Sequence, residues 1–182
     1  MKYPPVIIQR VTGFTLVELM VTVVVVGILS ALAVPNMRTF IQNMRMTSQT
    51  NEFISDLNFA RSEAIKRAAD VTVCKSADPT AASPTCLTTG TDWGTGRIIF
   101  IDSDANGQRV STEELLRVRE NLDGGNTLTN AANLIVYTRT GAKDPATKVD
   151  FNLCDTRGVA FGRQISIDLT GRTVLSKPPA GC

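Results

Sequence analysis

Hydrophobic side chains are concentrated in one run near the N-terminus, over residues 14–34. This run of 21 residues contains a single charge, the carboxylate of Glu18. Because an α-helix rises about 1.5 Å per residue, a helix of this length crosses a hydrocarbon core about 30 Å thick. A lone carboxylate in lipid costs at least ~2.5 kcal/mol, so such a group is normally present because it has a partner. The pattern predicts a membrane-spanning helix with one functional acidic side chain.

Helical periodicity continues beyond Pro35, although the sequence becomes polar. A proline removes one helical hydrogen bond, and here it is expected to bend the helix rather than end it. We predict one helix over about residues 14–68, whose amphipathic half, residues 36–69, packs on the rest of the chain. Charged residues such as Asp56 and Glu63 are expected mostly to lie off its apolar stripe. The predicted stripe comprises Met37, Phe40, Ile41, Met44, Ile54, Leu57, Ala64, Ile65 and Ala68.

Short runs of β-branched residues, separated by turn residues, begin at Val71 and continue to the C-terminus. No helical pattern intervenes between these runs, which favours antiparallel pairing. The predicted fold class is therefore α+β, with a long N-terminal helix packed on a β-rich head over residues 70–182. Residues 121–133, rich in glycine and asparagine, are expected to form a connection. Seven strands are predicted, over residues 71–75, 97–102, 114–120, 133–138, 148–153, 163–168 and 172–177.

Two patterns in the head predict buried side chains. Alternation in the last two predicted strands places Ile165, Ile167 and Val174 toward a core, with Leu175 as a further candidate. Trp93 is the single tryptophan, and it is predicted to anchor the core rather than to stack on a ligand. With 5% aromatic residues, the chain lacks the interleaved stacking platforms of single-strand nucleic-acid binders.

Charge and residue types exclude several classes of function. The 182 residues include 19 basic and 17 acidic side chains, so no global basic field indicates nucleic acid. The C-terminal residues 134–182 are nevertheless the basic part, with seven basic and four acidic side chains. The chain has no histidine, which removes histidine acid–base catalysis and histidine metal ligands. Because no GxSxG or SxxK motif occurs either, we do not expect an enzyme.

Four cysteines, all beyond the apolar run, are expected to form disulfides if the head lies outside the cytoplasm. Three pairings are possible, and the lack of a CxxC motif argues against a zinc site. We favour Cys74–Cys86, which would staple a loop, and Cys154–Cys182, which would hold the chain end. Four free buried thiols in a cytosolic fold are the alternative, which the membrane segment argues against.

A short segment, residues 1–13, precedes the apolar run and carries Lys2 and Arg10. A secretory signal places its small-residue cleavage site after the apolar core, whereas here the small residue Gly13 comes before it. Cleavage between Gly13 and Phe14 would leave the apolar run attached as the N-terminus of the mature chain. An ordinary signal anchor with a stray glutamate is the simpler alternative.

The stretch G-F-T-L-V-E-L, the apolar run and Pro35 together resemble the prepilin signature of type IV pilins and type II secretion pseudopilins. This resemblance implies that prepilin peptidase cuts after Gly13 and that the new terminal residue, Phe14, is N-methylated. It also implies that Glu18 pairs with the amine of Phe14, commonly that of a neighbouring subunit. The predicted organisation is a cleaved leader (1–13), a transmembrane and assembly helix (14–35), an amphipathic helix half (36–69) and a head (70–182).

A second motif, W-x-x-G-x-x-x-F-x-D-x-D-x-N-G over residues 93–107, is followed by E-E-L-L-R. It is similar to the FimT/GspH branch of minor pilins and minor pseudopilins, as is the C-terminal LCDTRG with FGR and GRTV. The resemblance implies a minor pilin that helps to assemble a type IV pilus, with other pilins and prepilin peptidase as partners. The alternative is a GspH-like minor pseudopilin of a type II secretion system. Either protein would sit in the bacterial inner membrane with one membrane pass and its head in the periplasm.

The loop DSDANGQRVSTE (102–113) has the spacing of an EF-hand calcium loop. Strands rather than helices are predicted on both sides of it, and Asp-x-Asp-x-Asn-Gly is also ordinary turn chemistry in a hairpin. We therefore expect no cofactor and no structural calcium. If calcium did bind, its ligands would be Asp102, Asp104, Asn106 and Glu113.

FimT-type members bind DNA through a Gly-Arg-x-Arg element near the C-terminus and serve natural transformation. This chain has Gly171 and Arg172, but Val174 stands where the second arginine would be. Arg163 and Lys177 are nearby cations that could contact phosphates without reading sequence. Double-stranded DNA is therefore a candidate partner, and scattered solvated charges are the alternative.

Overall fold

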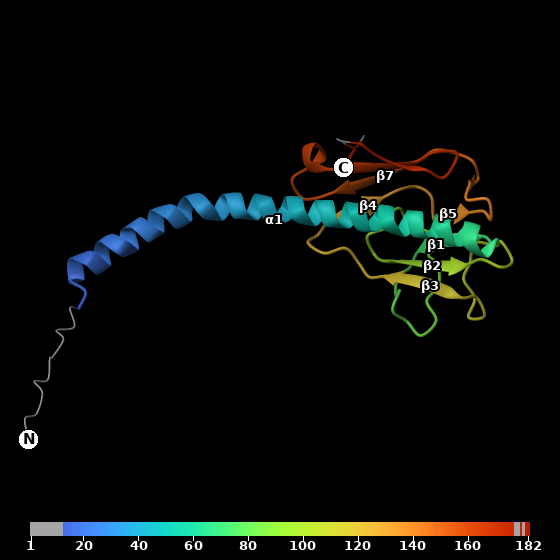
Figure 1. The fold of residues 1–182 in the computed structure, drawn as a ribbon, viewed down its shortest axis with the longest axis horizontal. Coiled ribbons are helices and arrows are strands. Elements are labelled where there is room, and N and C mark those ends of the chain that lie inside the picture. Colours follow the sequence, from blue (N-terminus) through green and yellow to red (C-terminus); the bar gives the residue numbers. More distant parts are fainter. Residues whose placement is uncertain (1–12, 177–178, 180) are drawn as a thin grey trace, which may run out of the picture. The chain divides into compact units, whose positions relative to one another are not determined.

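The computed structural model describes residues 13–176, 179, 181 and 182 (Figure 1). Two parts of the sequence predictions, residues 1–12 of the predicted leader (1–13) and the cation Lys177, lie outside the described residues. The chain divides into two units, Met1–Gln42 and Asn43–Cys182, and each unit is considered separately below.

One α-helix, α1 (Leu16–Arg67), continues past Pro35, in agreement with the predicted span of about 14–68. Its C-terminus is closed by Ala68, whose φ of 51° lies in the left-handed region. The Ala69 N–H donates to the Ala64 carbonyl at 3.3 Å, and the Ala68 N–H donates to the Ile65 carbonyl at 3.4 Å. These two bonds satisfy carbonyl groups of the last turn, which is how a Schellman cap ends a helix.

Within the second unit, α1 buries a face that differs from the predicted stripe. Ile65 is 53% exposed, and Ala68 is also exposed, although both were assigned to the stripe. Leu57 and Ala64 of the predicted stripe are fully buried, so that part of the prediction is confirmed. The assignment of Ile65 and Ala68 was wrong, because the face of α1 that carries its two largest buried side chains, Met46 and Phe53, packs in the core instead.

Two charged residues, Asp56 and Glu63, are also buried on α1, although the sequence analysis placed them off the stripe. The other buried residues recur at spacings of three and four: Met46, Thr50, Phe53, Leu57, Ala60 and Ala64.

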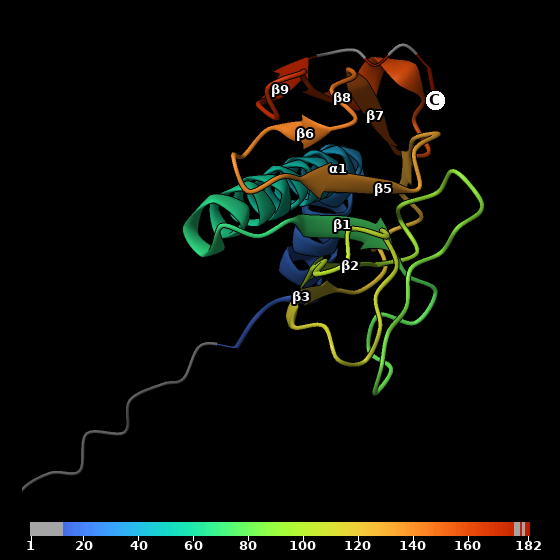
Figure 2. The ribbon, with the colours of Figure 1, turned by 90° about the vertical axis from the view of Figure 1, so that its right-hand side faces the viewer.

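In the part of the chain that the structure describes, nine strands form two antiparallel sheets. The five-stranded sheet has the order β3-β2-β1-β5-β6, and the four-stranded sheet has the order β4-β7-β8-β9. Figures 1 and 2 show the four-stranded sheet and strands β1–β3 on different sides of the second half of α1. The strands are β1 (Val71–Lys75), β2 (Arg97–Ile101), β3 (Leu115–Arg119), β4 (Thr127–Thr129), β5 (Leu134–Tyr137), β6 (Lys143–Asp144), β7 (Val149–Cys154), β8 (Arg163–Ile167) and β9 (Thr173–Ser176).

All seven predicted strands are confirmed, each to within one residue at its ends. The prediction that residues 121–133 form only a connection was wrong, because β4 lies inside that segment and pairs with β7. The two-residue strand β6 and the short 3-10 helix η1 (Val159–Phe161) were also missed. Each of these elements is too short to show a period in the sequence.

Three aromatic rings join the helix to the four-stranded sheet in the core. Trp93 is fully buried, as the sequence predicts, and its Nε1–H donates to the Ala132 carbonyl at 2.9 Å. Its ring meets Phe53 of α1 edge-on at 6.2 Å and Phe151 of β7 at 5.0 Å. Phe53 and Phe151 are 4.8 Å apart. Such edge-to-face contacts stabilise a core beyond the area that they bury.

The strand β9 departs from the expected burial. Ile165 and Ile167 of β8 are fully buried, but Val174 is 49% exposed and Leu175 is 44% exposed. The expectation that these two side chains face a core was wrong, because β9 is the last strand of its sheet and has a paired strand, β8, on one side only in the described residues.

Two disulfides tie down segments of the head that carry little regular structure. Cys74 bonds to Cys86, and Cys154 bonds to Cys182. This is the pairing that the sequence favours among the three possibilities. The first crosslink closes the loop that follows β1, and the second holds the C-terminus to the end of β7.

Candidate functional site

The N-terminal part of α1 is an apolar helix that the first unit leaves uncovered. By length and composition, this helix could cross a membrane. Every residue from Leu16 to Val34 is exposed in the chain alone. A helix that is apolar on all sides needs an apolar environment around it, either lipid or other helices. This segment is therefore a candidate site for membrane anchoring and for subunit packing.

The start of the helix gives Glu18 a local role that the sequence analysis missed. The Thr15 Oγ1 accepts the Glu18 N–H at 3.2 Å, so Thr15 is the N-cap and Glu18 stands at the third helical position. The spacing T-x-x-E is the signature of a capping box, in which a glutamate also favours the positive helix N-terminus. The signal was present in the sequence. Glu18 therefore lies in the first turn of the helix, at the end nearest the predicted new terminus.

Gly13 and Phe14 precede the helix and are fully accessible. Phe14 is 83% exposed, and a side chain added at Gly13 would meet nothing within 4 Å. A peptidase that cleaves an extended segment can therefore reach the bond between them. The assignments of cleavage, methylation and assembly to Gly13, Phe14 and Glu18 stay predictions.

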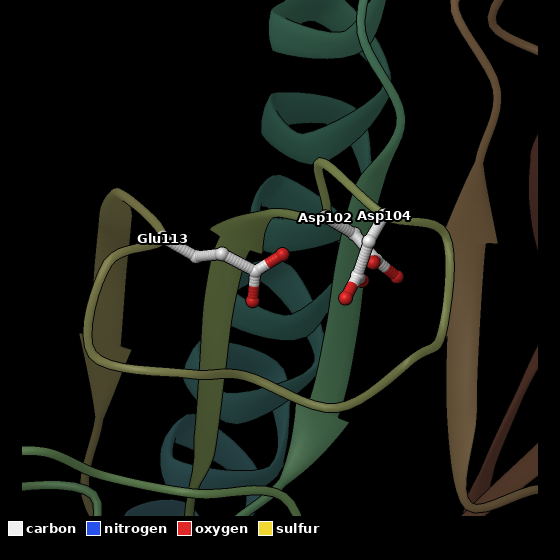
Figure 3. Close-up of side chains that lie close together, drawn as sticks. All are labelled: Asp102, Asp104 and Glu113. Carbon is white, nitrogen blue, oxygen red and sulfur yellow. The ribbon is translucent and has the colours of Figure 1, made fainter.

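The acidic loop after β2 brings three carboxylates together (Figure 3). One oxygen atom from each of Asp102, Asp104 and Glu113 lies within 4.8 Å of the others. Asp102 is buried, and this burial raises the pKa of its carboxyl group above the usual range. Hydrogen bonds from the Thr72 hydroxyl at 2.8 Å and from the Gly107 N–H at 3.0 Å oppose that shift.

Backbone N–H groups of the same loop donate hydrogen bonds to these carboxylates. Glu113 accepts the Ser103 N–H at 2.9 Å and the Val110 N–H at 3.0 Å. Asp104 accepts the Asn106 N–H at 3.2 Å. These bonds close the turn by the side-chain-to-backbone chemistry expected of Asp and Asn. That no structural calcium binds here stays a prediction, which calcium titration of the full chain by calorimetry would test.

The structure separates the basic residues that the sequence singles out. Arg163 lies at the start of β8, where its guanidinium donates to the carbonyls of Phe161 at 2.7 Å and Gly162 at 2.9 Å. Burial and the neighbouring Arg157 lower the pKa of Arg163. Arg172 is exposed beyond the other end of β8, so the two cations do not form one cluster.

Gly171 has a structural role in the turn between β8 and β9. Its φ of +79° is left-handed, and an added Cβ would lie 2.8 Å from the Gly141 carbonyl oxygen. The residue therefore needs to be glycine because of its conformation and because a second turn packs against it. This role accounts for Gly171 without any ligand.

Two family models match this chain. The model described as "Type II transport protein GspH" matches residues 49–171, and that of the prokaryotic N-terminal methylation motif matches residues 8–34. The chain belongs to the GspH family. With its methylation motif and apolar helix, it is a membrane-anchored minor pilin or pseudopilin of the FimT/GspH type, a family of structural subunits. No curated protein matched the chain.

Solved structures show the same fold. The type IV minor pilin FimU of Pseudomonas aeruginosa aligns with a TM-score of 0.61 and 23% identity, over 79% of this chain and 98% of that one. The minor pseudopilin EpsH of the Vibrio cholerae type 2 secretion system aligns with a TM-score of 0.50 and 13% identity, over 74% of this chain and 98% of that one. The pilin-like fold predicted from the sequence is confirmed.

This GspH-family head also contains a buried ion cluster that sequence reasoning missed. Asp56 of α1 is fully buried, and its carboxylate accepts hydrogen bonds from three arginines. Arg97 Nη2 lies 2.7 Å from Asp56, Arg117 Nη1 lies 2.9 Å away and Arg119 Nε lies 3.0 Å away. Glu52, one turn earlier, accepts Arg97 at 2.7 Å. The sequence shows two acids four residues apart, Glu52 and Asp56, and arginines at alternate positions 117 and 119. It does not show that these side chains meet in the fold.

Proposed function

We propose that this protein is a minor pilin of a type IV pilus, anchored in the inner membrane with its head in the periplasm before assembly. The observation that carries the proposal is the fully exposed apolar segment of α1, preceded by an accessible Gly13–Phe14 bond. Such a segment is stable in lipid as a single helix and in a filament as one member of a helical bundle. The same surface therefore serves as anchor and as assembly interface.

The assembly step assigned to Glu18 is electrostatic. Cleavage after Gly13 creates a positive amine on Phe14, and a carboxylate in an apolar environment strongly favours a cationic partner. Glu18 lies in the first turn of α1, where it stabilises the helix until a neighbouring amine reaches it. The pair sets the register between subunits, because an unpaired Glu18 in the bundle would be costly.

A minor pseudopilin of a type II secretion system is the competing function. The higher sequence identity with FimU, 23% against 13%, supports the pilus, whereas the description of the matching family model supports secretion. Both machines use the same subunit architecture, so the fold alone is neutral between them. Deleting the gene in the host separates them, since loss of surface pili without loss of secreted protein is the result expected here.

Processing depends on Gly13 in this proposal. The variant Gly13→Val is expected to retain its leader, because a branched side chain at the cleaved bond blocks the peptidase. Intact-mass measurement would show the extra 13 residues and no methylation of Phe14. Gly27→Val, at the glycine inside the apolar segment, is the matched control and should be cleaved normally, because an added Cβ there also meets nothing within 4 Å.

The assembly role is tested separately by Glu18→Gln. This variant keeps the size of the side chain and removes its charge, so we expect normal cleavage but loss of the protein from purified pili. Normal incorporation of Glu18→Gln would show that the charge pair is dispensable and would contradict the assembly step. Leader removal in Gly13→Val would contradict the processing site.

DNA uptake is a second candidate role, supported by the exposed Arg172 and by the basic excess over residues 134–182. If the cations contact phosphates, duplex binding should weaken steeply with salt and be lost when Arg163, Arg172 and Lys177 are all replaced by alanine. Arg163→Ala alone is expected to have little effect, because its guanidinium is already engaged by two carbonyls. Unchanged affinity in the triple variant would remove this role.

A further inference from the structure

Asn106 and Gly107 form the one Asn-Gly peptide in the sequence, and they belong to the loop of Figure 3. Asn106 is exposed to solvent in this loop, between β2 and β3. The amide carbon of an asparagine side chain can be attacked by the backbone nitrogen of the next residue, because this closes a five-membered ring. A side chain on that next residue hinders the attack, and glycine has none. The sequence therefore places a susceptible asparagine at an accessible position.

A local turn holds the Asn106 amide against the Gly107 peptide unit. Asn106 Oδ1 accepts the Gln108 N–H at 2.6 Å, so the side chain reaches across Gly107 to the residue two positions further on. This is an Asx turn, and it brings the amide carbon alongside the Gly107 nitrogen. Holding two reacting groups together in this way replaces a chance encounter by a prearranged one.

Hydrogen bonds polarise the groups that would react. The Gln108 N–H draws electron density from the Asn106 carbonyl and stabilises negative charge that develops on its oxygen. The Gly107 N–H donates to Asp102 Oδ2 at 3.0 Å, which weakens the N–H bond that has to break. Asn106 Nδ2, the leaving group, donates to Asp104 Oδ2 at 2.6 Å. The electrophile, the nucleophile and the leaving group are thus all oriented by the loop.

The fold also requires the glycine of this pair. Gly107 has a left-handed φ of +73°, and an added Cβ would lie 2.7 Å from Leu134 Cδ2. Any other residue at position 107 would therefore be strained and would clash with a neighbouring strand. The turn that the loop needs is the same feature that leaves Asn106 open to attack.

We propose that Asn106 is a site of spontaneous modification, at which the head forms a succinimide with Gly107 and opens it to aspartate or isoaspartate. The Gly107 nitrogen bonds to Cγ of Asn106, and its proton is lost to base in the solvent. The Cγ–Nδ2 bond breaks, and Nδ2 takes a proton from water and leaves as ammonia. Water then opens the ring at either carbonyl. Water is the only co-reactant, and conversion accelerates as the pH rises.

The product changes the loop. A carboxylate replaces the amide that donates to Asp104, so two like charges face each other where a hydrogen bond was. In isoaspartate the backbone runs through the former side chain and is one carbon longer. The N–H groups of residues 106 and 107 then no longer both reach Asp102. Hydrogen exchange at the Gly107 and Gln108 N–H groups should accelerate at least about tenfold after conversion.

Asn130 is a matched internal control. Its Oδ1 accepts the Ala132 N–H at 2.5 Å, which is the same turn as at Asn106. Ala131 follows it in place of a glycine. Asn126 is a second comparison, because it is buried and its Nδ2 donates to Gln49 Oε1 at 2.6 Å. The ratio of the rates at Asn106 and Asn130 therefore measures the effect of the glycine within one turn geometry.

The test is incubation of the full chain in detergent micelles at mildly alkaline pH, followed by trypsin digestion and mass spectrometry. Trypsin releases Asn106 in the peptide 98–109, where it is the only asparagine. We expect conversion at Asn106 to be at least about tenfold faster than at Asn130. Enzymatic methylation should detect isoaspartate in the same peptide, and an unincubated sample gives the background of the digestion.

Two variants make the test specific. Asn106→Gln should stop conversion in the peptide 98–109, because the longer side chain does not readily close the ring. Ala131→Gly, at an exposed position, should raise the rate at Asn130 toward that at Asn106.

Three results would overturn the proposal. One is conversion at Asn106 no faster than at Asn130, and another is conversion without isoaspartate. The third is an unchanged rate at Asn130 in Ala131→Gly with its fold intact, because the turn would then not prepare the attack. The measurement needs no filament, so it is independent of the assembly test of Glu18→Gln.

Discussion

Replacing Asp56 by alanine is expected to lower the free energy of unfolding of the head by about 3–5 kcal/mol. The carboxylate is fully buried between Arg97, Arg117 and Arg119, and Arg97 itself is 1% exposed. Removing the acid leaves the Arg97 charge buried, with only the half-exposed Glu52 to balance it. One Nη atom of Arg97 already lacks a partner among the described residues, so no spare bond is available to compensate.

Urea titration of the full chain in detergent, followed by the fluorescence of the single buried tryptophan, measures this loss. Glu114→Ala is the matched control, because it removes a carboxylate from an exposed pair with Arg67 and should leave stability unchanged. The double variant Asp56→Leu with Arg97→Met should recover part of the loss, since it removes both buried charges. Exposed ion pairs contribute below about 1 kcal/mol to the free energy of unfolding. A loss in that range for Asp56→Ala would show that solvent already screens the cluster.

Replacing Trp93 by alanine is expected to cost about 3–5 kcal/mol of unfolding free energy. The ring fills the space where Phe53 of α1 and Phe151 of β7 meet, so its removal opens a cavity between the helix and the four-stranded sheet. It also removes the donor to the Ala132 carbonyl. Trp93→Phe should cost less, because it keeps the edge-to-face contacts and loses only part of the volume.

Circular dichroism replaces fluorescence as the readout for these variants, because no other tryptophan is present. Phe161→Ala is the control: this ring is 41% exposed and touches Arg157 rather than the core. Equal stability losses in Trp93→Ala and Phe161→Ala would show that the aromatic cluster does not hold the helix to the four-stranded sheet.

The sequence by itself was sufficient for features that depend on neighbouring residues. The apolar run, its single Glu18 and the small residue before it are local signals, so the candidate processing and assembly sites could be placed without a structure. Alternation and turn residues located seven strands, because β-branched runs and their breaks are also local. The capping box at Thr15 belongs to the same class, and its signature was available but was not recognised.

The tertiary structure alone decided which faces and edges are covered. From the sequence, Asp56 was expected to be a solvated charge, because its arginine partners are 41 to 63 residues away along the chain. Which face of α1 is buried depends on how Met46 and Phe53 pack against the sheets. The helical period of the sequence is compatible with more than one buried face. Val174 and Leu175 alternate like buried residues, but β9 is the last strand of its sheet. Burial is a property of what packs against a residue, and those contacts are made between segments that are distant along the chain.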